Sequence, residues 1–393
     1  MIIYLVRKSY EELITFFYPL VMNVGDVNRG MKEKAMNYEQ ERMVAIEAVM
    51  KACFLCQTIR KTYLTDDVQE KEDGSPVTIA DLISQAVISL DLFKVFPHDA
   101  VAAEESLAGL EDDIKEKVVL QVKTFFPTLE TDKIFAAIER CTYEGGSRGR
   151  FWVLDPVDGT KGFIRDEQYA IALALVEEGE VVLGVLGCPN LPIGDSQRGS
   201  IFVAGKGQGS VMRSLYDSAE STIKVSPVCD SSQVLFCESF ERDHSSHKHA
   251  AQIAEILRIK KPPVRMDSQA KYGIVARGEA TIYLRLPTKK GYEEKIWDHA
   301  AGCLIVREAE GEVTDIRGKP LDFSHGRTLS QNYGVVATNR RLHPQVLSAI
   351  KKVYKVIAVQ ISQKVEIAIV ILLSFWTSFY KFRNQVCHYN VLS

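Results

Sequence analysis

A short apolar segment that ends in two closely spaced aspartates constrains the fold of this chain more than any other feature. Residues 151–154 (Phe-Trp-Val-Leu) have the composition of a buried strand, and Asp155-Pro-Val-Asp158-Gly follows directly. Two carboxylates on one tight turn repel each other unless a cation neutralises them. Hard divalent ions such as Mg²⁺ bind oxygen ligands of this kind, together with water and substrate phosphate. The segment therefore predicts either a metal site at the end of a strand or an Asp-Pro-Xaa-Asp-Gly surface turn, which is the usual meaning of such a string in isolation.

The residues after the second aspartate add an anion to the metal hypothesis. Gly159 and Thr160 can open a helix whose first N–H groups face a negatively charged group. A cation and a phosphate would then meet at one corner of the protein.

Composition favours a small-molecule partner. The chain has 393 residues, enough for a large core in one two-lobed domain or in two domains. Its 48 Lys and Arg against 51 Asp and Glu give a net charge of −3, so bulk charge does not argue for a nucleic-acid polymer or a membrane as partner. Eight cysteines in a chain of this length predict a reducing compartment rather than a disulfide scaffold. Cys53-Phe-Leu-Cys56 lies in a helical pattern without a second such pair, so we interpret it as core, with redox sensing as the alternative and no zinc site.

Both ends of the chain differ from the rest. Residues 1–37 have apolar stretches interrupted by charges and by Pro19, without a clean signal-peptide core, and predict an extension that is disordered or that targets the protein. Residues 353–393 form a second extension, either ordered or disordered, and its apolar part, 367–380, is shorter than the roughly 20 residues of a membrane helix. We expect no membrane partner and a cytoplasmic location, or a plastid or mitochondrial one if the N-terminal extension is a transit peptide.

Hydrophobic periodicity divides the remainder into helices and strands. Helices are predicted over 38–60, about 75–93, within 107–140, from about 270, over 298–308 and over 344–352. Strands are predicted over 100–103, 151–154, 170–176, 180–188, 234–237, 280–285 and 334–338. The glycines of 205–209 indicate a hairpin turn rather than a phosphate loop, because no Gly-Lys-Ser/Thr follows. Asp81 is predicted in the first turn of the second helix, where the helix dipole favours an anion.

Three histidines at 244, 247 and 249 have the spacing of a metal site. They lie at a predicted loop-to-helix junction without nearby cysteines. A helix start or a substrate contact is therefore favoured over zinc.

Further acidic clusters match a known family. Asp73 and the pair Glu104-Glu105 precede the central motif, and Trp297-Asp298-His-Ala-Ala-Gly follows it. In this order, Asp, Glu-Glu, Asp-Pro-Xaa-Asp-Gly-Thr and Trp-Asp-Xaa-Xaa-Ala-Gly resemble the signature of the lithium-sensitive, Mg²⁺-dependent phosphatases. That superfamily includes inositol monophosphatases, inositol polyphosphate 1-phosphatases, fructose-1,6-bisphosphatases and 3'(2'),5'-bisphosphate nucleotidases. The resemblance covers about 38–352, and its departures are small: Val157 stands where isoleucine or leucine is usual, and Ala103 where glycine is common.

The resemblance implies a fold and a division into lobes. The fold is a layered αβαβα sandwich of the inositol monophosphatase and fructose-1,6-bisphosphatase type. An N-terminal α+β lobe over 38–190 would carry the metal site, and a C-terminal α/β lobe over 191–352 would carry the nucleotide-binding residues.

The resemblance also implies roles for the acidic residues. The metal ligands for two or three Mg²⁺ ions would be the side chains of Glu104, Asp155, Asp158 and Asp298 and the carbonyl of Val157. Asp73 would act as general base and, with Thr160, polarise the attacking water. The N–H groups of Gly159 and Thr160 would hold the phosphate, and Glu105 would support the ligands.

Four segments of the second half, 240–246, 267–272, 283–287 and 294–299, resemble the eukaryotic 3'(2'),5'-bisphosphate nucleotidases. By this resemblance the substrate would be contacted by Glu241, His244, Ser268, Lys271 and Arg285. A doubly phosphorylated nucleotide needs cationic and hydroxyl partners beyond the metals. Without the resemblance, Lys271 and Arg285 would be interpreted as ordinary surface charges.

The function implied is Mg²⁺-dependent removal of the 3'-phosphate of adenosine 3',5'-bisphosphate to give AMP. Activity on 3'-phosphoadenosine 5'-phosphosulfate, giving adenosine 5'-phosphosulfate, and inhibition by Li⁺ are expected too. The alternatives are an inositol polyphosphate 1-phosphatase, acting on inositol 1,4-bisphosphate, and a catalytically silent nucleotide-binding protein, against which the intact ligand set argues. We expect a monomer or a weak homodimer.

Overall fold

The computed structural model describes residues 38–62, 68–70, 76–194, 197–241, 245–289 and 291–355. The predicted extension over 1–37 and residues 356–393 of the predicted C-terminal extension lie outside the described residues, as do Asp73 and His244. No helix in the described part of the chain is both long enough and apolar enough to cross a membrane.

The larger sheet has seven strands in the order β3-β4-β5-β6-β7-β8-β9. They are β3 (Ala100–Ala103), β4 (Arg150–Asp158), β5 (Ala170–Glu177), β6 (Glu180–Ile193), β7 (Gln197–Gly205), β8 (Gly209–Ser214) and β9 (Glu220–Thr222). Only the β3–β4 pair of this sheet is parallel. The predicted hairpin between β5 and β6 is confirmed, and so is the glycine turn, because Gly205 pairs with Gly209.

The smaller sheet has five strands in the order β11-β10-β12-β14-β13. They are β10 (Phe236–Ser239), β11 (Val264–Met266), β12 (Ile282–Arg285), β13 (Glu312–Thr314) and β14 (Val335–Thr338). A separate pair, β1 (Val68–Glu70) and β2 (Pro76–Thr78), is antiparallel. The predicted lobe boundary after residue 190 falls within β6, and the larger sheet continues to Thr222.

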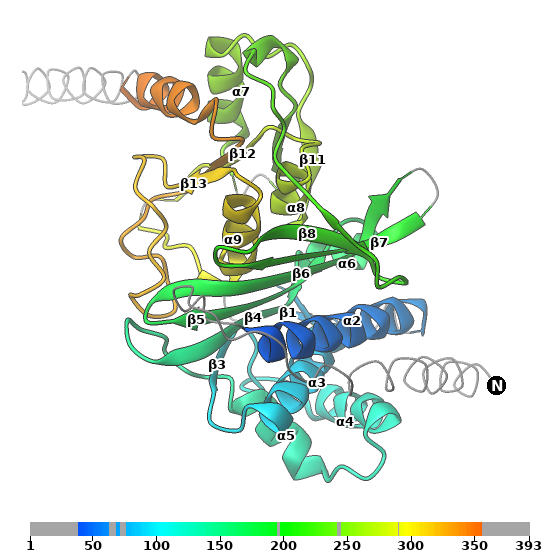
Figure 1. Cartoon of the computed structure of the whole chain (residues 1–393). Helices are drawn as coiled ribbons and strands as arrows, with labels where there is room; N and C mark the ends of the chain where they lie inside the picture. Colours follow the sequence, from blue (N-terminus) through cyan, green and yellow to red (C-terminus); the bar gives the residue numbers. More distant parts are fainter. Residues whose placement is uncertain are drawn as a thin grey trace, which may run out of the picture. The chain divides into compact units, whose positions relative to one another are not determined.

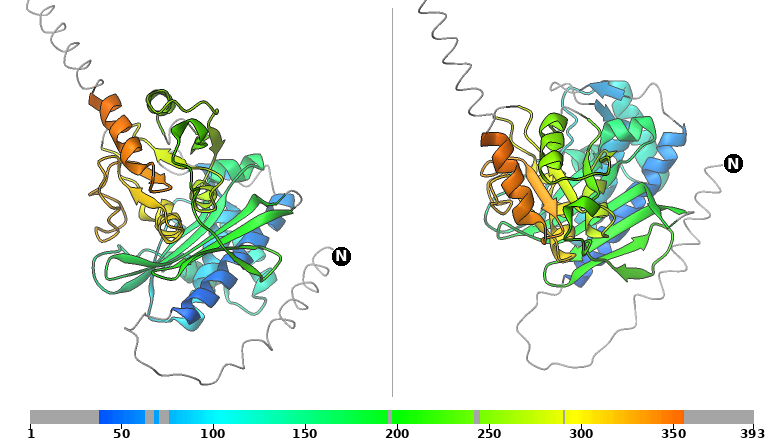
Figure 2. Two further views of the ribbon diagram at one scale, coloured as in Figure 1. Left: turned by 45° about the horizontal axis from the view of Figure 1, so that its top comes forward. Right: turned by 90° about the horizontal axis from the view of Figure 1, so that it is seen from above.

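Helices lie on both faces of each sheet (Figures 1 and 2). One face of the larger sheet is covered by α2 (Glu39–Thr62) and α3 (Ile79–Val95), with α4 (Asp112–Phe125) and α5 (Thr131–Glu139) beside them. Between the sheets lie α8 (Ala270–Ala276) and α9 (Ala300–Glu308). The far face of the smaller sheet is covered by α7 (His247–Ile256) and a helix over 343–355. The arrangement is the predicted αβαβα sandwich.

Three apolar cores separate these layers. The first joins α2 and α3 to the larger sheet, the second fills the space between the sheets, and the third lies under the outer helices. Strand β4 contributes to the first two, with Trp152 in one and Phe151 in the other. A strand covered on both faces needs apolar residues at every position, which explains why 151–154 is a continuous apolar run.

Candidate active site

The two central aspartates lie within a strand and not on a surface turn. Strand β4 continues to Asp158, with Asp155 opposite Ala172 and Asp158 opposite Ala170 on β5. Three residue steps on β4 thus match two on β5, which is a β-bulge, and bulges often redirect side chains next to active sites. Asp155 is only 2% exposed. The surface-turn alternative is therefore wrong, because Asp155 is buried between the packed layers and the strand continues to Asp158.

A short helix follows at once. Gly159 has a left-handed backbone, with φ of 84°, and precedes α6 (Thr160–Arg165). A Cβ at this position would lie 3.1 Å from the Cβ of Ser268, so the close approach of another loop adds to the need for glycine. The Thr160 hydroxyl is 3.3 Å from Asp81 Oδ1 and 3.2 Å from the carbonyl of Val157, and it can donate to either.

Asp81 is a site residue that our sequence reasoning missed. It is the third residue of α3, and its Oδ2 accepts hydrogen bonds from the N–H of Thr78 (2.8 Å) and from its hydroxyl (2.6 Å), a capping box. The cap leaves Oδ1 facing Thr160. The signal was the spacing Thr78-Xaa-Xaa-Asp81, which we interpreted only as a helix start. Asp73, which the resemblance assigned as the base, lies outside the described residues.

The carboxylates assigned as metal ligands converge. Glu104 follows β3, whose parallel register sets Ala103 beside Leu154, so the next residues, Glu104 and Asp155, lie side by side. Asp298 ends the 3₁₀ turn η3 (Ile296–Asp298), and α9 begins at Ala300, two residues later than the helix predicted over 298–308. Burial raises the pKa of Asp155 well above its ordinary range, and Glu104, Asp158 and Asp298 raise it further.

The other two aspartates respond in the same way. Burial and the charge of Asp298 raise the pKa of Asp158 to about 7, although Lys271 opposes them. Burial also raises the pKa of Asp298, with Arg285 opposing. Several buried carboxylates thus share one small volume with too little positive charge from the protein.

The cluster fits a hard divalent cation. Asp155 Oδ1 is buried and has no hydrogen-bond partner among the described residues. An orphaned carboxylate oxygen beside other carboxylates is costly, and a cation would remove both the desolvation and the repulsion. The carbonyl of Val157 lies between the two aspartates in the bulge and is directed towards the Thr160 hydroxyl.

Glu294, Asp298 and His299 also lie close enough together to hold a metal. However, Arg285 contacts Glu294 at 2.7 Å and Asp298 at 3.1 Å, and the Nδ1 atom of His299 is 2.8 Å from the Tyr272 hydroxyl. Burial alone would raise the pKa of Glu294, but Arg285 and His299 outweigh it and lower the pKa to about 2. We interpret this trio as an ion-pair network that orients Asp298, and only Asp298 is left to serve a metal.

The turn before α8 forms a wall of the site. The N–H of Gln269 donates to Asp158 Oδ2 at 2.5 Å, and the Gln269 side chain donates to the carbonyl of Trp297 at 2.7 Å. Ser268 has a φ of 68°, unusual for a residue with a side chain, and Lys271 is buried, with its Nζ 3.1 Å from the carbonyl of Met266. Burial lowers the pKa of Lys271, and Asp158 opposes this effect. Lys271 is thus not the surface charge that the sequence alone suggested.

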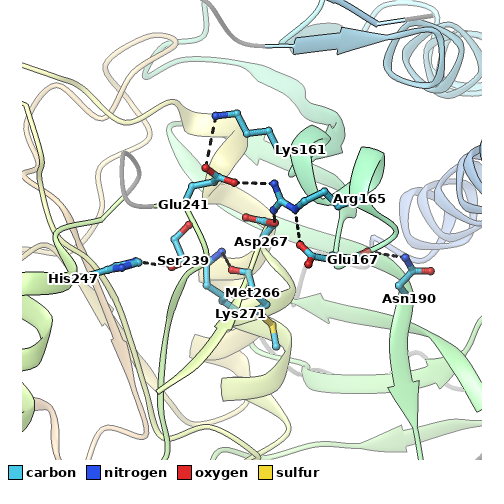
Figure 3. Close-up of polar contacts among 10 residues, drawn as sticks. All are labelled: Lys161, Arg165, Glu167, Asn190, Ser239, Glu241, His247, Met266, Asp267 and Lys271. Carbon is cyan, nitrogen blue, oxygen red and sulfur yellow. Dashed lines mark hydrogen bonds and ion pairs between the residues drawn. The ribbon is translucent and has the colours of Figure 1, made fainter. Parts of the chain in front are cut away.

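A second ionic network holds Glu241 (Figure 3). Arg165 on α6 donates to Glu241 at 2.9 Å, to Asp267 at 2.5 Å and to Glu167 at 2.7 Å, and Lys161 lies 3.7 Å from Glu241. The guanidinium also lies 4.7 Å from the centre of the Phe240 ring. Beside it is a cavity of about 310 Å³, lined by residues 166–168 and 265–267 among others. Glu241 is therefore joined to α6 by ion pairs with the cationic side chains of Arg165 and Lys161.

Two of the three histidines begin a helix, as predicted. Ser246 caps α7, which starts at His247. The His247 ring lies 2.9 Å from the carbonyl of Ser239, whereas His249 packs against the Tyr354 ring, so these two have separate partners. His244 lies outside the described residues.

Comparisons with known proteins agree with this geometry. Residues 37–355 match the model of the inositol monophosphatase family. A 3'(2'),5'-bisphosphate nucleotidase of Emericella nidulans is 44% identical over 352 residues, 81% of this chain and all of that protein. 3'(2'),5'-bisphosphate nucleotidase 1 of Arabidopsis thaliana is 47% identical over 343 residues, 80% of this chain and 97% of that protein.

Solved structures show the same fold at lower identity. An IMPase of Thermotoga maritima is 23% identical with a TM-score of 0.57, over 80% of this chain and 98% of that one. An inositol monophosphatase from Anabaena is 20% identical with a TM-score of 0.54, over 80% of this chain and 96% of that one. The αβαβα sandwich described above is the fold that these structures share.

Proposed function

The chain belongs to the inositol monophosphatase family, and from this membership we propose that it is a phosphoric monoester hydrolase that removes the 3'-phosphate of adenosine 3',5'-bisphosphate to give AMP. The family is metal-dependent. The relatives that carry this activity in their names match this chain over 80–81% of its length and over 97–100% of their own. The predicted activity on 3'-phosphoadenosine 5'-phosphosulfate extends the proposal to a second nucleotide with the same 3'-phosphate.

The observation that carries the proposal is the buried carboxylate cluster around Asp155. Asp155, Asp158, Glu104 and Asp298 would hold two or three Mg²⁺ ions with the carbonyl of Val157. When bound, such ions lower the pKa of a coordinated water and neutralise the oxygens of the phosphoryl group. Glu105, buried beside Glu104 with its backbone held by Gln85 at 2.8 and 3.0 Å, would fix the direction in which Glu104 leaves β3.

We assign proton handling to Thr160 and Asp81. The Thr160 hydroxyl lies within hydrogen-bond distance of Asp81 and at the head of α6, where a water facing the phosphate would lie. Asp81 would accept the proton that passes through Thr160. Asp81 would thus take the role that the resemblance assigned to Asp73. The N–H groups of Gly159 and Thr160 would face the phosphate oxygens.

The second phosphate and the ribose would meet the wall formed by the 267–271 turn. Lys271 is buried there, and among the described residues no carboxylate lies within salt-bridge distance of it, so an incoming phosphate would give it an anionic partner. Ser268 would add a hydroxyl, and Arg285 would hold Asp298 while facing the substrate. Glu241 and His244 would contact the far end of the nucleotide. We further place the protein in the cytoplasm as a monomer or weak homodimer, to be checked by fluorescence microscopy of a tagged chain and by light scattering.

One assay tests the proposal. Purified full-length protein should release phosphate from adenosine 3',5'-bisphosphate with Mg²⁺ and stop with EDTA. The kcat/KM for this substrate should exceed that for inositol 1,4-bisphosphate. A reversed preference would indicate an inositol polyphosphate 1-phosphatase, and nucleotide binding without phosphate release would indicate a silent binding protein.

The pair Thr160 and Asp81 gives a sharper test. Thr160→Val removes the hydroxyl at almost constant volume and should lower kcat by about 100-fold or more, the usual worth of a positioned proton-transfer group, with little change in KM. Thr160→Ser keeps the hydroxyl and should stay within about tenfold of the wild type. Equal losses in the two variants would show that the hydroxyl is not what matters.

A further inference from the structure

Two of the proposed metal ligands reach the site from different layers. Asp155 and Asp158 share one strand, so their spacing is fixed by the chain. Glu104 follows β3 in the larger sheet, whereas Asp298 precedes α9 between the sheets. Their separation therefore depends on how the two parts pack, and the backbone between them does not set it.

One arginine contacts the backbone beside Glu104 and the ring beside Asp298. The guanidinium of Arg327 donates from Nη2 to the carbonyl of Ala103, the residue before Glu104. It lies 4.7 Å from the centre of the ring of Trp297, the residue before Asp298. Planar guanidinium groups both stack on aromatic rings and donate in two fixed directions, which a lysine cannot do.

The backbone around Arg327 is fixed to the Asp298 side. The N–H of Ile296 donates to the carbonyl of Arg327 at 3.1 Å, and the N–H of Leu329 donates to the carbonyl of Glu294 at 2.8 Å. These two bonds form a short antiparallel bridge that ends one residue before Trp297. Arg327 is thus attached to this side by its main chain and by its ring contact.

The guanidinium joins two chain segments on the Glu104 side. Its Nη1 donates to the carbonyl of Tyr143 at 3.0 Å. The 141–143 segment is itself bonded to β3, since Tyr143 N–H donates to Val101 at 3.0 Å and Ala103 N–H donates to Cys141 at 2.9 Å. The Arg327 guanidinium therefore contacts the end of β3 and the end of the 141–143 segment that is bonded to it.

We propose that Arg327 is a positioning residue that sets the distance between Glu104 and Asp298 and thereby the affinity of the site for its divalent cations. This inference rests on the proposed function. Arg327 touches neither the substrate nor the cations in this scheme; it acts through the two ligands next to its contacts. Outer partners of metal ligands commonly contribute about 10- to 100-fold to metal affinity.

The experiment compares metal binding in wild type and three variants of the full chain. Arg327→Met keeps the length and apolar stem but removes both donors and the charge. Arg327→Lys keeps the charge but loses the planar fork. The matched control is Arg317→Met, because Arg317 is exposed, lies in the same region and also stacks on a ring, that of Tyr333 at 5.2 Å. Mn²⁺ binding is titrated by electron paramagnetic resonance, and kcat is measured against Mg²⁺ concentration.

We expect Arg327→Met to weaken Mn²⁺ binding by about 10- to 100-fold and to raise the Mg²⁺ concentration for half-maximal rate in parallel. At saturating Mg²⁺ its kcat should return to within about threefold of wild type, because the ligands themselves are intact. The Mn²⁺ affinity of Arg327→Lys should lie between those of wild type and Arg327→Met, and the affinity of Arg317→Met should match that of wild type.

Mn²⁺ affinity within twofold of wild type in a folded Arg327→Met would overturn the proposal, as would a kcat loss that saturating Mg²⁺ does not restore. If Arg327→Met does not fold, the same two criteria apply to Arg327→Lys. A wild type that binds Mn²⁺ but releases no phosphate from adenosine 3',5'-bisphosphate would refute the proposed function, and the titrations would still decide the role of Arg327.

Discussion

Asp155 combines burial, neighbouring negative charge and an unpaired oxygen in one side chain. It is 2% exposed, with its Oδ1 unpartnered among the described residues and its pKa raised by burial and by four nearby carboxylates. Such a group costs stability in the free protein and is tolerated where it serves a function.

Asp155→Asn tests that balance. The change should lower kcat with adenosine 3',5'-bisphosphate by more than about 100-fold, since losing a ligand should cost at least as much as losing an outer partner. In EDTA the variant should melt at the same temperature as wild type or higher, because a buried repulsive charge is gone. Calorimetry with EDTA and with Mg²⁺ measures both. A variant that keeps wild-type turnover would remove Asp155 from the site.

The raised pKa of Asp158 predicts an unusual pH dependence of stability and of Mg²⁺ binding. Burial and Asp298 raise its folded-state pKa from 3.8 to about 7, so the folded metal-free protein holds a proton that the unfolded chain has lost. This contribution to stability is present below about pH 4 and is lost as the pH rises through about 7. The melting temperature in EDTA should therefore fall as the pH rises from about 4 to about 7. Mg²⁺ binding should strengthen over the same interval, because the cation must displace the proton.

Asp158→Asn is the control for this effect. The asparagine does not titrate, so both slopes should become shallower. Melting curves and Mg²⁺ titrations at several pH values would show it. Slopes identical to those of wild type would assign the titration to another group.

At the scale of elements, α6 and the 267–269 turn are held together by several contacts. Gly159 leaves room for Ser268, the Gln269 N–H bonds Asp158, and Arg165 pairs with the nearly buried Asp267. Burial raises the pKa of Asp267, and Lys271 and Arg165 oppose it. The helix proposed to hold one phosphate, α6, thus also carries Arg165. This arginine holds in place the turn that is proposed to contact the other phosphate.

Arg165→Met should loosen that wall. We expect KM for adenosine 3',5'-bisphosphate to rise by about tenfold, equivalent to about 1.4 kcal/mol of binding, while the Mg²⁺ requirement changes little. Steady-state kinetics at saturating Mg²⁺ measures this. Lys224→Met, which breaks an exposed pair with Glu310, is the control and should leave KM unchanged. A larger effect on metal affinity than on KM would contradict this role for Arg165.

At the scale of the whole described unit, we expect metal binding to depend on close packing between the layers. Gly184 on β6 faces α9, and a Cβ there would lie 2.9 Å from the carbonyl of Ala301. Gly302 on α9 similarly faces the Tyr272 ring, which a Cβ would approach to 2.3 Å. Asp298 precedes α9, so a shift of this helix would move a proposed metal ligand.

Gly184→Ala should therefore weaken Mg²⁺ binding as well as stability. Overpacking of this kind typically costs about 1–3 kcal/mol. Ile350→Val in the outer core should cost about 1 kcal/mol and leave Mg²⁺ affinity unchanged, because Ile350 lies on the outer helix over 343–355, in a different core from α9. Denaturant unfolding and metal titration of both variants separate the two effects. Equal metal affinities would show that α9 does not set the position of Asp298.

Patterns in the amino-acid sequence were enough to predict the main elements and the family. Hydrophobic periodicity, turn glycines and helix caps act over a few residues, so the hairpins, α3, α7 and the apolar run of β4 could be predicted. The order of the acidic motifs, through the family resemblance, identified the fold. The surface-turn alternative for 155–159 remained open at that stage, because a local string does not reveal which layers will cover it.

Which polar groups meet could be seen only once the chain was folded. The contacts of Thr160 with Asp81, of Arg285 with Glu294 and of Arg327 with Ala103 join residues from 9 to 224 positions apart. Such pairs follow from strand register and from the packing of α3 and α9 on the larger sheet, and no pattern within one segment encodes them. Asp81 and Arg327 have no distinctive local sequence pattern that indicates their proposed roles. Those roles follow from their neighbours, which the fold determines.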